Sequence, residues 1–475
     1  MYLMADMLLK HVPNVNVTIL RFAATERVTK VPVPKGTHLL DVTNVSFDRM
    51  QWVNDVLWSQ DSLTWCWWYG MKMMFGGWWQ AMKPCHAVND QPDLIDRIRS
   101  ANYDLAVIDI FLTTCNWPIV NQFQIPYVAF SPIGPIYLSE LHSAVPMPFS
   151  TSKSIIRSRT DRMSFCDRLE NTFDQMMPNN LGLQWHNFGA LLQVGWTDVA
   201  LNSVFSLYKQ NRLVEFPKPT ALNQQHLEPT DFTGHELKGE LRKFVDDPMS
   251  KGTIIFSMTT VGTLVTMPEW LAVPLNETLA KFTDYRVIWR TTDENCTSVG
   301  GPWPSNFFVT PWYDQLGVLN HPKTRLLITH GGLTTYLEAM YFGVPMLGIA
   351  LGFDHPSNVA LLENMGVCRS SDKATLNTDS LAESVQSILK DDSMHARSVK
   401  LRGMLRDVRE WLGAARNGWP VTVWWLDYVK RHRHNINALR PKSDNVPSII
   451  YFNVDVWLFI GMQCAIAAFF LSGDK

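Results

Sequence analysis

The sequence predicts an α/β protein large enough for two domains. Of its 475 residues 46% are hydrophobic, which is enough to fill two cores. In the C-terminal half, the apolar run at 326–328 has the length and composition of a buried parallel strand, and a second run follows at 346–350. A glycine pair and a helical segment lie between the two runs. The stretch therefore predicts a compact β-α-β unit.

The turn after the first of these strands predicts an anion site. Gly331-Gly332 lets the chain turn sharply from the strand into the helix. The backbone N–H groups around Gly332 to Thr335 lie at the start of the helix, where they have no partner within it. Together with the positive end of the helix dipole they suit a diphosphate. His330 stands beside them as a hydrogen-bond donor.

Residues on both sides of this turn extend the predicted site to a whole nucleotide. Trp312 offers a flat ring on which a base can stack, and Gln315 offers an amide for a base edge or a ribose. Glu338, inside the helix, offers a carboxylate for two ribose hydroxyls. An alternative stays open for Glu338, because residues 335–338 also fit a capping box in which it only bonds the helix entry.

In this order the residues closely resemble the nucleotide-sugar motif of the UDP-glycosyltransferases, membrane-bound animal enzymes that put a sugar on small lipophilic acceptors. The resemblance is strong from about residue 250 to 434 and looser before it. Further matches lie at 103–109, 202–203, 253–257, 287–290 and 423–429. The chain is identified as a divergent member of that family, truncated at its N-terminus.

The resemblance implies the α/β fold called GT-B, in which two Rossmann-like domains face each other across a cleft. The implied parts are an acceptor-binding domain at 1–215, a linker at 216–238, a UDP-sugar-binding domain at 239–414 and a helix at 415–434 that returns to the first domain. Strands of the first domain are expected near 16–20, 105–108 and 127–130.

The chemistry implied by the resemblance is inverting sugar transfer. In the family a His takes the proton from the acceptor hydroxyl, and an Asp orients that His. Asp109 matches the Asp and follows the apolar strand at 105–108, at the edge where such sheets present functional groups. The alternative for Asp109 is that it caps the following helix.

The matching His is expected just ahead of Met1, together with a signal peptide and the first strand of the domain, which is why we expect a truncation. His11 lies near the end of a predicted helix at 2–12, and we interpret it as a surface residue. A rival to the enzyme is therefore a non-catalytic, membrane-anchored protein that still binds a UDP-sugar.

Some positions depart from the family pattern in the sugar and phosphate contacts. Asp354-His355 stands where the family usually has Asp-Gln before the final Asn, here Asn358, and that pair contacts the sugar hydroxyls. Thr260 stands in a turn where Ser is usual, and its hydroxyl can still bind a phosphate. Glucose is the simplest expectation for the sugar, with glucuronic acid left open.

Composition excludes several classes of partner. Lys and Arg number 42 against 44 Asp and Glu, so no basic excess attracts nucleic acid. The 7 cysteines show no Cys-x-x-Cys spacing, so we expect no metal and no cofactor besides the UDP-sugar, which is a co-substrate. Trp and Met residues at 65–79 suit either a lipophilic acceptor pocket or plain core or membrane-surface packing. A homo-oligomer is possible.

The C-terminal segment 454–471 predicts a single transmembrane helix. Its uncharged part, from Val456 onward, is somewhat shorter than the ~20 residues that span a bilayer core, and a buried terminal helix is the alternative. The resemblance implies an endoplasmic reticulum membrane protein with its catalytic part in the lumen. Sequons at Asn16, Asn44, Asn276 and Asn295 permit that location.

Overall fold

The computed structural model describes most of the chain and both of its domains. The described residues are 2–22, 32–43, 87–88, 90–110, 119–120, 122–134, 150–152, 157–172, 203–216, 218, 220–227, 232, 234–258, 267–291, 302–415, 420–433 and 454–472. Thr260, the Trp-rich stretch at 65–79 and the prolines of the predicted linker at 217, 219 and 229 lie outside these residues.

Six parallel strands form the sheet of the second domain, in the order β12-β11-β10-β7-β8-β9. Their bounds are Gly252–Ser257 (β7), Tyr285–Arg290 (β8), Phe307–Thr310 (β9), Thr324–Thr329 (β10), Met346–Gly348 (β11) and Cys368–Ser370 (β12). β7 is an interior strand and is buried along its whole length. Helices cover both sides of the sheet, so the side chains of β7 are buried on both of its faces.

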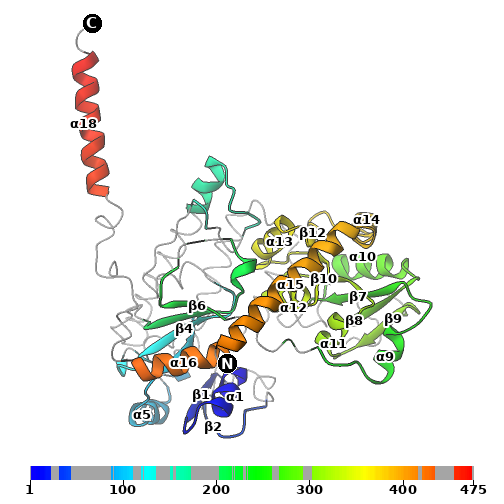
Figure 1. Ribbon diagram of the computed structural model, residues 1–475, viewed down its shortest axis with the longest axis horizontal. Coiled ribbons are helices and arrows are strands. Elements are labelled where there is room, and N and C mark those ends of the chain that lie inside the picture. Colours follow the sequence, from blue (N-terminus) through cyan, green and yellow to red (C-terminus); the bar gives the residue numbers. More distant parts are fainter. Residues whose placement is uncertain are drawn as a thin grey trace.

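Two helical layers enclose this sheet, as the right-hand part of Figure 1 shows. Ile254 and Phe256 of β7 share a core with α10 and α14, whereas Ile255 between them shares a core with the helices of the opposite layer. The helices are α9 (Gly239–Val245), α10 (Glu269–Ala280), α11 (Gln315–Asn320), α12 (Leu333–Phe342), α13 (His355–Asn364), α14 (Thr378–Leu389) and α15 (Asp392–Ala415).

The first domain contains a four-stranded parallel sheet in the order β3-β4-β5-β6 and a separate parallel pair, β1 and β2. Their bounds are Val17–Phe22 (β1), Thr37–Val42 (β2), Ala106–Asp109 (β3), Tyr127–Ser131 (β4), Phe205–Tyr208 (β5) and Gln224–His226 (β6). Leu40 and Val42 of β2 share a core with Ile108 of β3 and with α5 (Pro92–Ser100). The pair therefore packs with the larger sheet.

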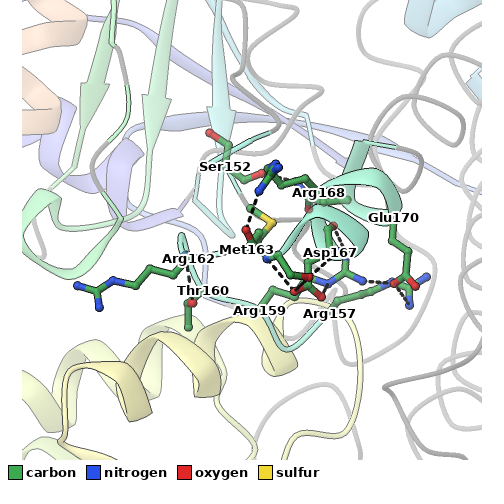
Figure 2. A network of polar contacts seen from close by, with 11 residues as sticks. Ser152, Arg157, Arg159, Thr160, Arg162, Met163, Asp167, Arg168 and Glu170 are labelled. Atoms are coloured by element: carbon green, nitrogen blue, oxygen red, sulfur yellow. Dashed lines mark hydrogen bonds and ion pairs between the residues drawn. The ribbon is translucent and has the colours of Figure 1, made fainter.

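A network of ion pairs fixes the segment at 157–172 of the first domain (Figure 2). Ser164 and Asp167 form a capping box at the start of a short helix, with the Asp167 carboxylate accepting from the Ser164 backbone N at 3.0 Å and from its Oγ at 2.6 Å. These bonds lower the pKa of Asp167. Arg157 and Arg159 both pair with Glu170 on the same helix. The network holds the helix to the preceding extended chain.

The helix α16 (Val421–His432) brings the chain back to the first domain. Val421, Leu426 and Val429 are buried in one core with Phe205 and Leu207 of β5. The N-terminal helix α1 (Tyr2–His11) packs on the same helix. Figure 1 shows α15 and α16 passing in orange from the second domain to the first. The two domains are thereby linked by a helix as well as by the chain that first joins them.

Most predicted elements are confirmed at this level. The strands expected near 16–20, 105–108, 127–130, 253–257, 287–290 and 326–328 coincide with β1, β3, β4, β7, β8 and β10, and the helix at 2–12 is α1.

One detail of the domain junction was not predicted. Val214, in the short 3-10 helix η1 (Arg212–Val214), is buried in the core of the second domain. The chain therefore touches the core of the second domain at residue 214, before β6 returns it to the sheet of the first domain.

The C-terminal helix α18 (Val454–Ser472) stands apart from both domains in Figure 1. Large apolar side chains in its described part, up to residue 466, are exposed, among them Trp457, Leu458 and Phe459. The alternative of a buried terminal helix is therefore wrong. Within the residues that the structure describes, no helix is both long and apolar enough to cross a membrane. The prediction of a transmembrane helix at 454–471 is not supported by this structure.

The packing of α16 predicts a large effect of one substitution on stability. Leu426→Ala should lower the free energy of unfolding by about 2–5 kcal/mol, because the buried side chain leaves a cavity among Phe205, Leu207 and Val429. Leu3→Ala on α1 is the matched control, since Leu3 is 60% exposed. Urea denaturation of the full chain measures both. Similar midpoints for the two variants would contradict the packing described for α16.

Candidate functional site

The turn from β10 into α12 has a backbone shape that requires glycine. Gly331 has a φ of 87°, in the left-handed region, and an added Cβ there would lie 2.7 Å from the Cγ2 of Val359. Gly332 follows as the N-cap of α12. A Cβ on Gly332 would lie 2.5 Å from the Nε2 of His330. The glycine pair therefore lets the imidazole lie directly against the start of the helix.

Side chains of α13 hold this turn from the other side. Asp354 is the N-cap of α13, and Asn358 lies one turn into it. The Nδ2 of Asn358 donates to the Gly331 carbonyl oxygen at 3.0 Å and to the Asp354 carboxylate at 2.7 Å. All three residues are buried. The Asn358 amide thus joins the turn after β10 to the segment after β11.

Two buried histidines meet at the same place. The rings of His330 and His355 are edge to face, with centroids 4.3 Å apart. Burial lowers the pKa of His330 to about 4, opposed only by a hydrogen bond with the Ser257 backbone. Burial also lowers the pKa of His355 well below its ordinary value. Repulsion from His330 in its protonated form and from Lys373 lowers it further. Both imidazoles are neutral at pH 7, so each can donate and accept hydrogen bonds.

A chain of hydrogen bonds joins the predicted ribose residues. The Oγ of Ser257 and the hydroxyl of Tyr313 both donate to the Oε1 of Gln315, at 2.9 and 3.1 Å. The Nε2 of Gln315 then donates to the Glu338 carboxylate at 2.5 Å. Burial raises the pKa of Glu338, while Gln315 and then Lys209 act against that rise. Gln315 and Glu338 are therefore brought together by the fold.

The capping-box alternative for Glu338 is wrong. The helix starts at Leu333 with Gly332 as its N-cap, so Thr335 lies inside the first turn, where its side chain is buried. Glu338 accepts from Gln315 rather than from the helix entry. The start of the helix depends on the glycine turn, which the local capping pattern does not take into account.

Trp312 presents its ring to solvent next to these groups. The residue is 73% exposed, and the Arg290 guanidinium lies over the ring, 5.1 Å from its centroid. The following residues begin α11, where Asp314 caps the helix by accepting from Gly317 N at 3.0 Å. A large exposed aromatic ring at a helix start, beside Gln315, is suited to stacking with a flat base.

Two charged residues lie at the carboxyl edge of the first-domain sheet, and one of them contacts α12. Asp109 is the last residue of β3, and Lys209 directly follows β5 in the same parallel sheet, so both lie at its carboxyl edge. The Nζ of Lys209 donates to the Oγ1 of Thr334 in the first turn of α12, at 2.6 Å. Residues 111–118, which follow shortly after Asp109, lie outside the described residues, as does Thr260, so the alternative that Asp109 caps the next helix stays open.

Sequence reasoning missed four participants: Ser257, Arg290, Tyr313 and Lys209. Ser257 and Arg290 end strands that the sequence does predict, so their place at a carboxyl edge was available as a signal. Lys209 also follows an apolar run, at 204–208. Its contact with Thr334 joins residues 125 positions apart. No local pattern carries that information.

Comparison with known proteins shows the family to which the chain belongs. A family model described as "UDP-glucoronosyl and UDP-glucosyl transferase" matches residues 13–474. The chain belongs to the UDP-glycosyltransferase family. Among its curated relatives, UDP-glucuronosyltransferase 2C1 of Oryctolagus cuniculus is 27% identical over 93% of this chain and 90% of its own length. UDP-glucuronosyltransferase 2B10 of Homo sapiens is 26% identical over 82% of this chain and 72% of its own length. This glycosyltransferase is a divergent member.

Solved glycosyltransferase structures share the fold. The glycosyltransferase of kitacinnamycin matches with a TM-score of 0.57 and 17% identity, covering 90% of this chain and 94% of its own. The spinosyn forosaminyltransferase SpnP matches with a TM-score of 0.56 and 15% identity, covering 92% and 95%. Together with the two parallel sheets, these likenesses confirm the GT-B prediction for the two domains of the enzyme.

The burial of His330 predicts a pH dependence of stability. Its pKa is about 4 in the folded protein and near 6.5 when exposed, so the unfolded chain binds the proton first as the pH falls. The contribution of neutral His330 is therefore full above pH 6.5 and is lost between about pH 6.5 and 4, amounting to about 3 kcal/mol. His330→Gln should flatten the measured curve by that amount.

Urea unfolding of the full chain at several pH values between 4 and 7.5 tests this. His235→Gln is the control, because the His235 side chain is 69% exposed, and it should leave the curve as in the wild type. If His330→Gln and the wild type lose stability in parallel over this range, the buried neutral state of His330 is wrong.

Proposed function

We propose that this enzyme is an inverting hexosyltransferase that moves glucose from UDP-glucose to hydroxyl groups of small lipophilic acceptors. The observation that carries the proposal is the Ser257–Gln315–Glu338 hydrogen-bond chain beside the start of α12. An oriented amide and a carboxylate lie in contact there, which supports a ribose site. The N–H groups of α12 lie next to it, where a diphosphate needs partners.

The donor is proposed to bind along the second domain in three parts. The uracil stacks on Trp312, whose ring is exposed, and the ribose hydroxyls bind Gln315 and Glu338. The diphosphate binds the start of α12, where Gly332, Thr334 and His330 are supported by the turn geometry and Thr260 by the sequence alone. The hexose is assigned to the remaining predicted residues, Asp354, His355 and Asn358.

The proposal of glucose over glucuronic acid rests on charge. Asp354 places a buried carboxylate among the groups assigned to the sugar, and a uronate would bring a second negative charge beside it. The two histidines there are neutral at pH 7 and so supply hydrogen bonds rather than a compensating positive charge. Sugar hydroxyls are suited to such a set of donors and acceptors.

The proposed transfer is a direct displacement at the anomeric carbon. The acceptor oxygen attacks from the face opposite UDP, the bond from that carbon to the UDP oxygen breaks, and UDP leaves with the electron pair. The acceptor proton would pass to the imidazole of the His that the resemblance implies, which Asp109 would orient and whose positive charge Asp109 would stabilise. Asp109 is supported by its position at the carboxyl end of β3. Lys209 lies at the same edge of that sheet.

The cellular location is a separate part of the proposal. We place the enzyme at the endoplasmic reticulum membrane with its catalytic part in the lumen. Support comes from the resemblance, from the exposed sequon residue Asn16 and from the exposed apolar side chains of α18. A homo-oligomer is also compatible with those exposed side chains.

The ribose role predicts a loss of donor affinity on substitution of Glu338. Glu338→Ala in the full chain should weaken UDP binding about 10- to 100-fold, because hydrogen bonds to a charged group are lost. Glu269→Ala, an exposed residue at the start of α10, is the control and should bind UDP as the wild type does. Isothermal titration with UDP measures both, and thermal unfolding confirms that both fold. Equal affinity in Glu338→Ala and the wild type would remove Glu338 from the ribose site.

The role of Asp109 predicts a loss of turnover without a loss of donor binding. In a form of the enzyme that carries the His implied by the resemblance, Asp109→Asn should lower sugar transfer about 10²- to 10⁴-fold, because that His is no longer held in the required tautomer, while UDP affinity stays unchanged. Transfer from UDP-glucose and from UDP-glucuronic acid to a panel of phenols is measured side by side.

This comparison also separates the enzyme from its rival. A wild-type chain that binds UDP but transfers neither sugar above background would support the non-catalytic, UDP-sugar-binding alternative. Faster transfer from UDP-glucuronic acid than from UDP-glucose would contradict the proposed sugar while leaving the donor site intact.

A further inference from the structure

Lys209 directly follows β5, at the carboxyl edge of the first-domain sheet. Its backbone N donates to the Ser131 carbonyl oxygen at 3.0 Å, which continues the pairing of β5 with β4. A few residues later, Val214 is buried in the core of the second domain. The backbone of Lys209 is therefore positioned by the sheet of the first domain, and the residues after it touch the core of the second domain before β6 returns to that sheet.

The ammonium group of Lys209 reaches the start of α12. Its Nζ donates to the Oγ1 of Thr334 at 2.6 Å, and it interacts with the charge of Glu338, one turn further along the helix. Burial lowers the pKa of Lys209, with Glu338 acting against that shift. A positive charge at a helix N-terminus is opposed by the helix dipole. An anion between the helix start and Nζ would be attracted by both.

A second observation at this site points to a polar ligand. His355 is 94% buried, since its exposed fraction is 6%, and its Nδ1 lacks a hydrogen-bond partner within the described ranges. A buried polar atom without a partner is costly unless a ligand or water supplies one. This atom lies on the ring that contacts His330, which in turn lies against Gly332 at the start of α12. Lys209 and His355 thus approach the glycine turn from different elements.

We propose that Lys209 binds the diphosphate of the UDP-sugar from the first domain, across the domain boundary. The donor is then held by both domains, although its other proposed contacts come from the second. When the bond between the anomeric carbon and the UDP oxygen breaks, the electron pair stays on UDP, and the ammonium group stabilises the added negative charge. This inference rests on the proposed function, because it needs a UDP-sugar at α12.

The charge of Lys209, rather than its length or its bond to Thr334, is the property that matters. A hydrogen bond from an ammonium group to a neutral hydroxyl is weaker than a contact with a doubly charged diphosphate, in which both partners carry charge. The expected effects of substitution therefore depend on the phosphates of the ligand. Uridine has the base and ribose but no phosphate, so its affinity should not depend on Lys209.

The experiment titrates UDP and uridine into the full-length wild type and into Lys209→Met, Lys209→Arg and Lys218→Met at one ionic strength. Lys209→Met should weaken UDP binding about tenfold or more and leave uridine binding unchanged. Lys209→Arg should keep most of the UDP affinity. Lys218→Met is the matched control, because Lys218 belongs to the same segment and lies over the Tyr208 ring, 5.8 Å from its centroid. It should bind both ligands as the wild type does.

Three results would overturn the inference, and they are distinguishable. Equal UDP affinity in the wild type and Lys209→Met would remove Lys209 from the phosphate site while leaving the proposed function in place. Tighter UDP binding by Lys209→Met would show that the lysine competes with the donor. A wild type that binds neither UDP nor uridine would overturn the proposed function itself.

Discussion

The left-handed backbone at Gly331 is the constraint on which the donor site depends. It turns the chain from the buried strand β10 into α12 within two residues, so that the helix start faces the carboxyl edge of the sheet. Asn358 holds the same turn through the Gly331 carbonyl oxygen. Gly332 leaves room for the His330 ring. A side chain at either glycine would displace the groups that the nucleotide and sugar require.

Burial explains the electrostatics of the site. His330 and His355 are too desolvated to carry a charge at pH 7, so they act as neutral hydrogen-bonding groups. The Glu338 carboxylate and the Lys209 ammonium group interact with each other near the start of α12. One belongs to each domain. A bound diphosphate would therefore change the electrostatic interaction between the two domains as well as the net charge between them.

Much of the second domain could be predicted from the sequence, because its signals are local. The apolar strands, the glycine turn and the order of Trp312, Gln315 and Glu338 are all readable from short segments, and the fold brings Gln315 and Glu338 into contact as expected. The capping box failed because the helix start is set by the turn before it. The contact of Lys209 with Thr334 was not predictable, because it depends on how two domains meet. The apolar composition of 454–471 predicted the helix α18 but not its surroundings.

The central claim is that UDP binds across the start of α12 with its diphosphate between the two domains. A crystal structure of the full chain with UDP tests it most directly. The account predicts the diphosphate on the backbone N–H groups that follow Gly332, with the Lys209 ammonium group on its other side and the uracil on Trp312. A UDP molecule bound elsewhere, or bound with its diphosphate away from both α12 and Lys209, would contradict the account.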